Sequence, residues 1–385
     1  MDFNFSQEHQ LFKDTLERLV TREIEPLLAR YPADEPLPRE ACERIRELLL
    51  PMGIHGARVP TALGGTGLGA LGLGIAAQTL PYEAFEPLMC IEAVALRIAL
   101  AGTDEMKATV LPDLLAGRKF AGSATSEPDV GSDPRGITTR ARLEGDRYIL
   151  NGTKIWVSAG TLADVLLVMA STGRDDKGHN VITPFLVDVA ASPVATRRHD
   201  LLGIRQSHIC EVHLDNVSIP SGNMLAGAAG DAHGVLTSTW LSQRPVQALC
   251  NVRLAEKAYE AALAYALQRK QFGKPIASFQ LVQDMLAEMR TLVDCSKLLC
   301  YRALTLCDAG ERPHLESSMA KLYSCQSALR VTNLAVEIHG AFGASKEFPV
   351  EKYFRDERVL AFPDGTINIQ KLIMGRELTG IRAFS

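Results

Sequence analysis

The stretch FQLVQDMLAEMRTLVDCSKLLCYRALTLCDAG (279–310) decides the fold class of this chain. One seam recurs through it at steps that alternate between three and four residues, and only Ser296 in it is polar: Phe279, Val282, Leu286, Met289, Val293, Ser296, Cys300, Ala303 and Cys307. Such a seam is typical of a long helix that packs along other helices. Gly310 predicts the end of this helix, and a second long helix is expected from about Leu315 to His339, ending near Gly340.

The region that precedes these helices has a different pattern. In YILNGTKIWVSA (148–159), a β-rich run lies on each side of Asn151-Gly152, which predicts a hairpin at that dipeptide. Further strands are expected in ADVLLVMAS (163–171), ITPFLVDVA (182–190) and ICEVHLDNVSIP (209–220). FSQEHQLFKDTLERLVTREIEPLLARY (5–31) again has helical spacing. The sequence therefore predicts an α+β protein with a helical domain at 1–120, an all-β domain at 121–225 and a helical bundle at 226–385.

Composition excludes several functional classes. The 385 residues are 46% apolar and 22% charged, which is ordinary for a globular protein. The net charge of −4 has the wrong sign for a dedicated nucleic-acid binder. No run approaches the ~18 apolar residues that a membrane span needs, and MDFNFSQEHQ (1–10) does not resemble a secretory signal. The eight cysteines contain no C-x-x-C pair, so we expect reduced thiols in a cytoplasmic protein.

Several motifs favour ordinary structure over chemistry. Gly67, Gly69 and Gly72 match G-x-G-x-x-G, with Glu86 at a plausible distance beyond, but neither a preceding strand nor a βαβ unit is expected there. The histidines lack the spacing of metal ligands, so no metal site is predicted. Cys90, Cys250 and Cys300 have no placed basic partner, which favours core residues over nucleophiles.

Four stretches together resemble the acyl-CoA dehydrogenase family of flavoproteins. They are SATSEPDVGSD (123–133) with LNGTKIWVSAG (150–160), LGIRQSHICEVHLDNVSIP (202–220), YALQRKQFGKPIASFQLVQDMLAEM (265–289), and AVEIHGAFG (335–343) leading through RDERVLAFPDGTINIQ (355–370). The resemblance covers essentially the whole chain in the family's order. It implies an N-terminal helical domain, a middle β-barrel, a C-terminal four-helix bundle, and one FAD per subunit of a tetramer.

The resemblance also implies site residues, each by its place in a motif. Ser126 would bind the flavin ring, Trp156 would pack on it, and Ser158 would donate near its N5 atom. The full set of implied FAD contacts is Ser126, Ser132, Trp156, Ser158, Arg269, Gln271, Phe272, Glu337, Gly340, Thr366 and Asn368, with Arg269, Gln271 and Phe272 reaching a neighbouring subunit's FAD. Implied substrate contacts are Ser132, Gln243, Arg244 and Gly365.

The catalytic base implied by the resemblance is Asp364. A family glutamate in this position removes the α-proton of an acyl thioester while the β-hydride passes to flavin N5. Aspartate is one methylene shorter, which removes roughly 1.3 Å of reach, and a misplacement of about 1 Å can cost ~100-fold in rate. The other position known for the base in this family reads LSQRP (241–245), where Gln243 is no base.

Three interpretations of Asp364 stay open. The backbone shifts to deliver it to a thioester, or the substrate is another carbon acid, as in the related nitroalkane oxidases. The third is a catalytically weakened subunit of a hetero-oligomer. Other departures from the family pattern are Glu337 in place of glutamine, Ala341 in place of glycine, and Cys250 and Arg253 in place of small residues.

The expected partners follow from the same resemblance. They are an acyl-CoA or acyl-carrier thioester in lipid metabolism, an electron-transfer flavoprotein as acceptor, and further copies of the chain in a tetramer or dimer. EPLMC (86–90) contains no arginine where a dicarboxylate-specific branch would carry one, which disfavours a glutaryl-like substrate.

Overall fold

A computed structural model describes residues 4–225 and 232–383 of the chain. The described residues form two compact units. The first comprises residues 4–73, 83–200, 205–225 and 232–239, and the second comprises residues 74–82, 201–204 and 240–383. The predicted boundary at 225/226 borders residues outside the described part, and both predicted domain boundaries stay predictions.

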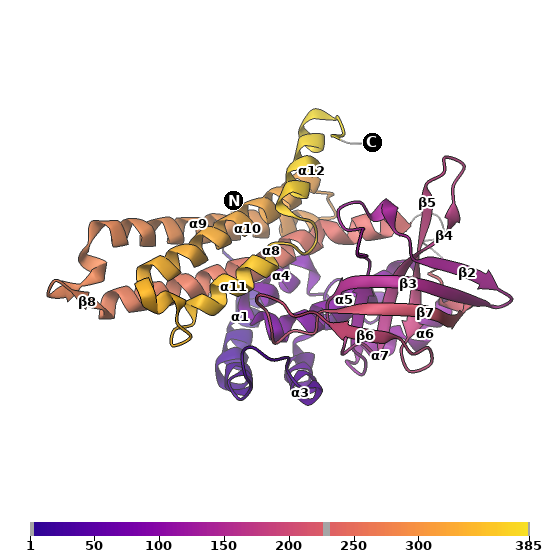
Figure 1. The fold of residues 1–385 in the computed structure, drawn as a ribbon, viewed down its shortest axis with the longest axis horizontal. Coiled ribbons are helices and arrows are strands. Elements are labelled where there is room, and N and C mark those ends of the chain that lie inside the picture. Colours follow the sequence, from indigo (N-terminus) through magenta and orange to yellow (C-terminus); the bar gives the residue numbers. More distant parts are fainter. Residues whose placement is uncertain (1–3, 226–231, 384–385) are drawn as a thin grey trace. The chain divides into compact units, whose positions relative to one another are not determined.

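Short helices make up the amino-terminal part (Figure 1). The α-helices are α1 (Gln7–Leu19), α2 (Glu25–Leu28), α3 (Arg39–Leu49), α4 (Gly69–Thr79), α5 (Tyr82–Ala101), α6 (Asp104–Thr109) and α7 (Leu111–Leu115). A π-helical turn at Val20–Ile24 joins α1 to α2, and 3₁₀ turns lie at Leu50–Met52, Ile54–Gly56 and Thr61–Leu63. The glycine-rich segment thus follows a 3₁₀ turn and opens α4. Among the described residues before it, from Asn4 on, there is no strand, which favours a connection between helices over a dinucleotide-binding loop.

Seven strands form the sheet of the first unit. They are β1 (Ala121–Ala124), β2 (Arg140–Glu144), β3 (Arg147–Val157), β4 (Val165–Arg174), β5 (Asn180–Asp188), β6 (Ala195–Arg198) and β7 (Cys210–Pro220). Their order is β1-β4-β2-β3-β7-β6, with β5 paired to β4. Short 3₁₀ turns at Pro134–Gly136 and Ser221–Asn223 flank the sheet. Strands β1 and β4 run parallel, whereas β3 and β7 form a long antiparallel pair.

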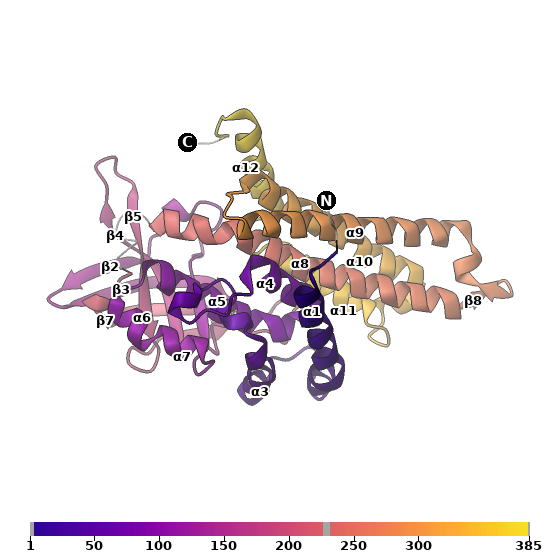
Figure 2. The same ribbon diagram turned by 180° about the vertical axis from the view of Figure 1, so that it is seen from behind.

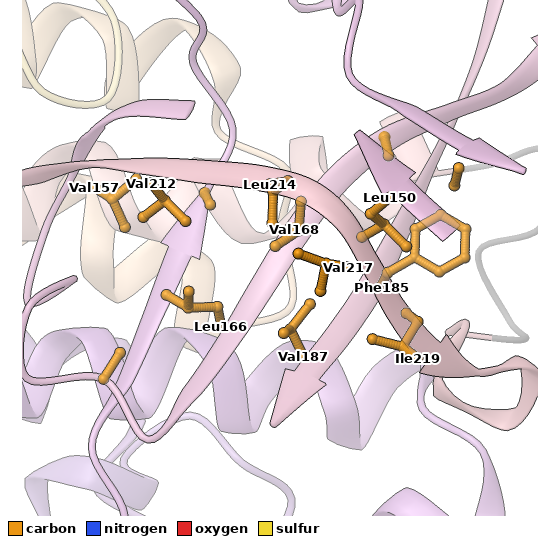
Figure 3. Close-up of a cluster of buried hydrophobic side chains, with 14 of the residues drawn as sticks. Leu150, Val157, Leu166, Val168, Phe185, Val187, Val212, Leu214, Val217 and Ile219 are labelled. Carbon is orange, nitrogen blue, oxygen red and sulfur yellow. The ribbon is translucent and has the colours of Figure 1, made fainter. Parts of the chain in front are cut away.

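Apolar side chains from alternate positions of these strands converge in one core (Figure 3). Leu166 and Val168 of β4 meet Val212 and Leu214 of β7, and Phe185 of β5 fills the side toward Leu150, Val217 and Ile219. The alternation of buried and exposed residues along β7 is the pattern expected when one face of a strand is covered. The core holds Leu150 and Val157 of β3, and the candidate-site residues Trp156 and Ser158 lie on either side of Val157.

The hairpin predicted at Asn151-Gly152 is wrong. β3 runs without a break from Arg147 to Val157, and Gly152 sits at a register shift against β7 with φ of 154°. A Cβ there would lie 2.4 Å from the Thr139 hydroxyl oxygen, so glycine permits a close backbone approach and not a turn. The actual β2–β3 turn is Gly145-Asp146, where Gly145 has φ of 61°.

Long helices dominate the second unit. They are α8 (Ala232–Gln268), whose first residues belong to the first unit, α9 (Gln280–Asp308), α10 (His314–His339), α11 (Val350–Leu360) and α12 (Ile367–Thr379). The small β8–β9 hairpin (Lys270–Gln271 and Lys274–Pro275) joins α8 to α9, with 3₁₀ turns at Ile276–Ser278 and Gly340–Ala344. Figures 1 and 2 show α9 and α10 side by side, with this hairpin at one end and α12 toward the other.

The seam that predicted α9 is confirmed over its central turns. Met289, Val293, Ser296, Cys300 and Ala303 are buried, whereas the outer members of the seam are only partly covered. The Ser296 hydroxyl donates to the Leu292 carbonyl, so its burial leaves no unpaired hydroxyl hydrogen. α10 begins at His314 and ends at His339, within one residue of the prediction.

The described helices and cysteines bear on two further predictions. None of the described helices has the length and apolar character needed to cross a membrane. Within the described residues none of the eight cysteines forms a disulfide, and six of them are buried. Burial raises the pKa of Cys250 far above that of a free thiol, and it raises the pKa of Cys300 to about 12. These two thiols are therefore protonated at neutral pH, as the core interpretation expects.

Candidate active site

A strained turn at the end of β3 presents an exposed indole. Trp156 has φ of 58° and Ala159 has φ of 53°, values that non-glycine residues adopt rarely. The Trp156 side chain is 56% exposed, and His199 stacks on it with ring centroids 4.2 Å apart and an interplanar angle of 24°. Strain of this kind persists only where surrounding contacts enforce it, and it often marks a functional site.

The loop that carries Ser126 is tied to the same turn. The Ile155 amide donates to the Ser126 carbonyl at 2.9 Å, which places Ser126 beside Trp156. Lys154, fully buried, donates to the Thr125 carbonyl at 3.0 Å and to Glu127 at 2.8 Å. The structure thus brings Ser126, Trp156 and Ser158 together, whereas Ser132 lies exposed farther along the loop.

Glu127 anchors this loop from inside. Burial alone would raise its pKa, but hydrogen bonds from Lys154, Thr138 and Thr139 outweigh it and lower the pKa to about 2. The carboxylate accepts from the Thr138 hydroxyl at 2.6 Å and from the Thr139 amide at 2.9 Å. Glu127 therefore stays ionised and holds both ends of the loop at any ordinary pH.

Asp364 occupies a separate turn in the second unit. It has φ of 57°, and Gly365 follows with φ of 97°. Gln370, fully buried, donates to the Asp364 carbonyl at 3.2 Å and to the Gly365 carbonyl at 3.0 Å. Thr366 caps α12 by accepting from the Ile369 amide at 3.4 Å. These contacts fix the backbone on both sides of the half-buried Asp364. Such a fixed backbone is typical of a residue held in position for a function and not of a loose turn.

The Asp364 side chain interacts with α8. Burial lowers the pKa of Arg244, and the negative charge of Asp364 opposes that change. The same carboxylate contributes to the raised pKa of Cys250, so it lies near two residues that are six positions apart on α8. Gln243 is buried beside Arg244. The structure thereby brings Asp364 and Gly365 near Arg244, and the substrate roles of these residues and of Gln243 stay predictions.

Pro245 has a local consequence next to Arg244. Proline has no amide hydrogen, so the Leu241 carbonyl one turn earlier loses its helical partner. The buried Ser317 hydroxyl of α10 donates to that carbonyl at 2.6 Å. The helix therefore continues through Pro245 while α10 holds the segment that carries Arg244.

The remaining predicted FAD contacts lie elsewhere in the second unit. Arg269, Gln271 and Phe272 sit at the β8–β9 hairpin, which lies toward the opposite end of α9 and α10 from α12 (Figure 1). Phe272 is 92% exposed with φ of 51°, and the Arg269 guanidinium lies 5.8 Å from the Phe342 ring centroid, near Gly340. This chain thus groups Arg269 with Gly340 but separates them from Asp364, Thr366 and Asn368.

Glu337 is an implied FAD contact with a negative charge, which would repel a phosphate group of the cofactor. Its side chain is exposed and accepts from Asn333 at 2.7 Å, on the same face of α10. Asn333 therefore orients the carboxylate along the helix.

Comparison with known proteins decides the family. The models of the N-terminal, middle and C-terminal domains of acyl-CoA dehydrogenase match residues 6–118, 122–217 and 233–379. The chain belongs to the acyl-CoA dehydrogenase family. A probable acyl-CoA dehydrogenase of Bacillus subtilis, YngJ, is 31% identical over 98% of this chain and 100% of its own length. Glutaryl-CoA dehydrogenase of Desulfococcus multivorans is 32% identical over 99% of both chains.

Solved structures agree with this acyl-CoA dehydrogenase assignment. A glutaryl-CoA dehydrogenase of Mycobacterium smegmatis in complex with FADH2 has 28% identity and a TM-score of 0.88, covering 99% of this chain and 97% of the other. The predictions of the family, of its fold, of the FAD cofactor and of an oxidoreductase acting on CH–CH bonds are confirmed at the level of the family. The roles of individual residues stay predictions.

The first unit suits the isoalloxazine ring of FAD. Trp156 offers an exposed flat aromatic surface. Ser158 follows it two residues later, and Ser126 is joined to the preceding residue, Ile155, by a backbone hydrogen bond, so both bring hydroxyls that can donate to ring heteroatoms. The site therefore contains both the stacking surface and the hydrogen-bond donors that a flavin needs.

Sequence reasoning missed one buried carboxyl group beside this turn. Glu86 of α5 drew notice only as part of the rejected glycine motif, yet it accepts a hydrogen bond from the Ala159 amide at 3.2 Å. The available signal was a glutamate within the otherwise apolar run AFEPLMCI (84–91), since a charge on a fully covered helix needs a specific partner.

Proposed function

We propose that this acyl-CoA dehydrogenase family member desaturates the α,β bond of an acyl thioester, with Asp364 as the base. The observation that carries the proposal is the geometry of Asp364, whose left-handed turn is fixed by Gln370 while its carboxylate lies near Arg244 of α8. A base held by its backbone loses little conformational entropy when it meets a substrate. The fixed turn also offers a way to compensate for the shorter side chain.

Each site residue has a distinct role in the proposed reaction. Asp364 accepts the α-proton, and Arg244 contributes a buried positive charge beside it. Trp156 supports a flat ring, while Ser126 and Ser158 supply hydrogen bonds to its edge. FAD, when bound, accepts the β-hydride.

Assembly and electron transfer belong to the same proposal. Arg269, Gln271 and Phe272 lie at an exposed hairpin away from Asp364, which supports their contact with FAD of a neighbouring copy in a homo-oligomer. An electron-transfer flavoprotein is the proposed electron acceptor. A cytoplasmic location and a role in lipid metabolism are proposed with them.

The acyl group is proposed to lack a terminal carboxylate. EPLMC (86–90), the segment where a dicarboxylate-specific branch would carry an arginine, holds the buried Glu86 and no cationic residue. A second carboxylate would therefore have no partner in this segment, although relatives named glutaryl-CoA dehydrogenase match the chain.

An anaerobic titration tests the proposed function. FAD-loaded protein is mixed with saturated, branched and glutaryl acyl-CoAs, and flavin absorbance near 450 nm is recorded. We expect bleaching by at least one neutral acyl-CoA and little by glutaryl-CoA. A yellow protein that no thioester bleaches would contradict the proposal, and recovery only on mixing with a related chain would assign it to a hetero-oligomer.

A second candidate is favoured by the aspartate itself. An aspartate in this position occurs in the nitroalkane oxidase branch, where it deprotonates carbon beside a nitro group. Including a primary nitroalkane in the same titration, followed by admission of oxygen, separates the two. Bleaching by the nitroalkane alone, with peroxide formed on reoxidation, would replace thioester desaturation by carbon-acid oxidation.

A further inference from the structure

Glu86 is a buried carboxyl group to which the proposed reaction gives no role. It lies on α5 and is 1% exposed. Its Oε1 atom accepts from the Ala159 amide at 3.2 Å, and Oε2 is buried without a hydrogen bond of normal geometry. Burying a carboxyl group with one incompletely satisfied oxygen costs stability. Its presence beside the turn at Trp156–Ala159 therefore suggests a function for Glu86.

The Ser158 hydroxyl and the His208 amide lie close enough to this carboxyl group to lower its pKa, although Oε2 makes no hydrogen bond of normal geometry. Ser158 is half-buried, between the covered Glu86 and the exposed Trp156 surface. The turn is crowded from the other side as well, because a Cβ on Gly160 would lie 2.5 Å from the Cys210 sulfur. Ser158 therefore has little freedom to move, although its hydroxyl hydrogen can rotate.

The surroundings leave Glu86 as a group that titrates near neutral pH. Burial raises its pKa to about 7, and the like charge of Glu83 adds to that rise, while hydrogen bonds from Ala159, His208 and Ser158 oppose it. Cys42 of α3 and Cys210 of β7 also face it, and burial raises the pKa of each thiol to about 12.

His208 is the remaining titratable group at this place. Burial lowers its pKa, and its ring lies 2.8 Å from the Leu37 carbonyl through Nε2 and 2.7 Å from the Thr161 hydroxyl through Nδ1. Arg39 and Arg198 add positive charge that lowers it further. The pKa of His208 therefore lies below the ordinary histidine value, and the ring is neutral at neutral pH.

We propose that Glu86 is a positioning residue that decides whether the Ser158 hydroxyl donates toward the flavin or toward the protein interior. The inference rests on the proposed function, because it takes Ser158 to lie at the reactive edge of FAD. When Glu86 is ionised, its carboxylate accepts the single hydroxyl hydrogen of Ser158. When Glu86 is protonated, it donates to the Ser158 oxygen, and the hydroxyl hydrogen is free to point outward.

The consequence is a pH-dependent redox balance of the bound cofactor. A donor at the flavin edge stabilises the electron-rich reduced form, and a nearby negative charge opposes it. Rising pH should therefore favour oxidised FAD beyond the change that free flavin shows. Glu86→Gln keeps the shape of the side chain, and its amide group donates at every pH, so this variant should behave like the protonated state.

The test equilibrates FAD-loaded protein with a reference redox dye between pH 5.5 and 8.5 and needs no substrate. We expect the reduced-to-oxidised flavin ratio of the wild type, divided by that of Glu86→Gln, to fall about tenfold with a midpoint near pH 7, the worth of about one hydrogen bond. A constant ratio across this range would overturn the proposal.

Two variants show whether the effect passes through Ser158. In a Ser158→Ala background, Glu86→Gln should change the ratio by less than about twofold, since there is no hydroxyl left to orient. An undiminished tenfold effect there would refute positioning and indicate a direct effect of charge. Glu83→Gln, one turn earlier on α5, is the matched control, and it should move the midpoint to lower pH without removing it.

Failure of the proposed function is distinguishable from failure of this inference. If no thioester bleaches the flavin, the function fails, but the dye titration still reads the effect of Glu86. If the wild type is bleached by a thioester while its ratio to Glu86→Gln stays flat with pH, the inference alone fails.

Discussion

At the scale of single residues, the turn at Gly365 allows a sharp test of backbone geometry. Gly365 has φ of 97°, and a Cβ there would lie 2.7 Å from the Gln370 amide nitrogen. We expect Gly365→Ala to lower the free energy of unfolding by roughly 1–3 kcal/mol, through strain and displacement of Gln370. Gly375→Ala is the matched control, because it lies within α12 with nothing within 4 Å of its Cβ position.

Chemical denaturation measures both variants. The control should be neutral or more stable by about 0.5–1 kcal/mol, since alanine is the better helix former. Equal effects of the two substitutions would mean that the turn at Asp364 is not held in the conformation described here.

Glu86 and Gly152 show what the sequence could and could not predict at this scale. Asp364, Trp156 and the serines were found because they stand in recognisable motifs. Glu86 could not be found in this way, because its role depends on a contact with Ala159 that is 73 positions away. The mistaken hairpin has a similar cause: Asn-Gly favours a turn locally, but pairing with β7 on both sides of Gly152 overrides that preference.

At the scale of elements, the buried Glu86 of α5 should make the free energy of unfolding depend on pH. The folded protein keeps the proton on Glu86 up to about pH 7, whereas an unfolded chain releases it near the ordinary glutamate pKa of 4.5. Stability contributed by this site therefore falls as pH rises from 4.5 to 7 and is then constant. We expect Glu86→Gln to raise the free energy of unfolding at pH 8 relative to wild type by up to roughly 3 kcal/mol.

Thermal unfolding of the FAD-free protein at pH 5 and pH 8 makes this measurement. The stabilisation by Glu86→Gln should be much smaller at pH 5. An identical difference at both pH values would show that Glu86 has an ordinary pKa.

The loop between β1 and β2 should respond to loss of its internal anchor. Lys154→Met removes the cation that donates to Glu127 and to the Thr125 carbonyl, and it leaves a buried carboxylate without its charged partner. We expect a loss of roughly 3–5 kcal/mol, together with weaker FAD binding because Ser126 belongs to this loop. Lys119→Met removes a more exposed pair with Asp188 and should cost below about 1 kcal/mol.

Denaturation and FAD titration check the two variants side by side. Similar losses in both would contradict the anchoring role of Glu127.

The long helices α9 and α10, by contrast, could be predicted without such detail, because their seams repeat over many turns and local signals mark both ends.

At the scale of the whole molecule, the exposed β8–β9 hairpin predicts self-association. Phe272 is 92% exposed at a positive φ, and Leu281 nearby is 79% exposed. Phe272→Asn keeps a residue type that tolerates this backbone while removing the ring. We expect light scattering to show an oligomer for the wild type, and a smaller assembly or weaker FAD binding for the variant. A monomeric wild type that binds FAD tightly would remove the proposed contact between copies.

The proposed function depends on Asp364, which we infer removes a proton from the carbon beside an acyl thioester. Asp364→Asn retains the size of the side chain but not its basicity, so FAD should stay bound. The most direct measurement is anaerobic stopped-flow bleaching of the flavin by an acyl-CoA that reduces the wild type. We expect at least a roughly 10³-fold loss of rate in Asp364→Asn, in keeping with the removal of a general base; bleaching within about tenfold of the wild-type rate would show that Asp364 is not the base.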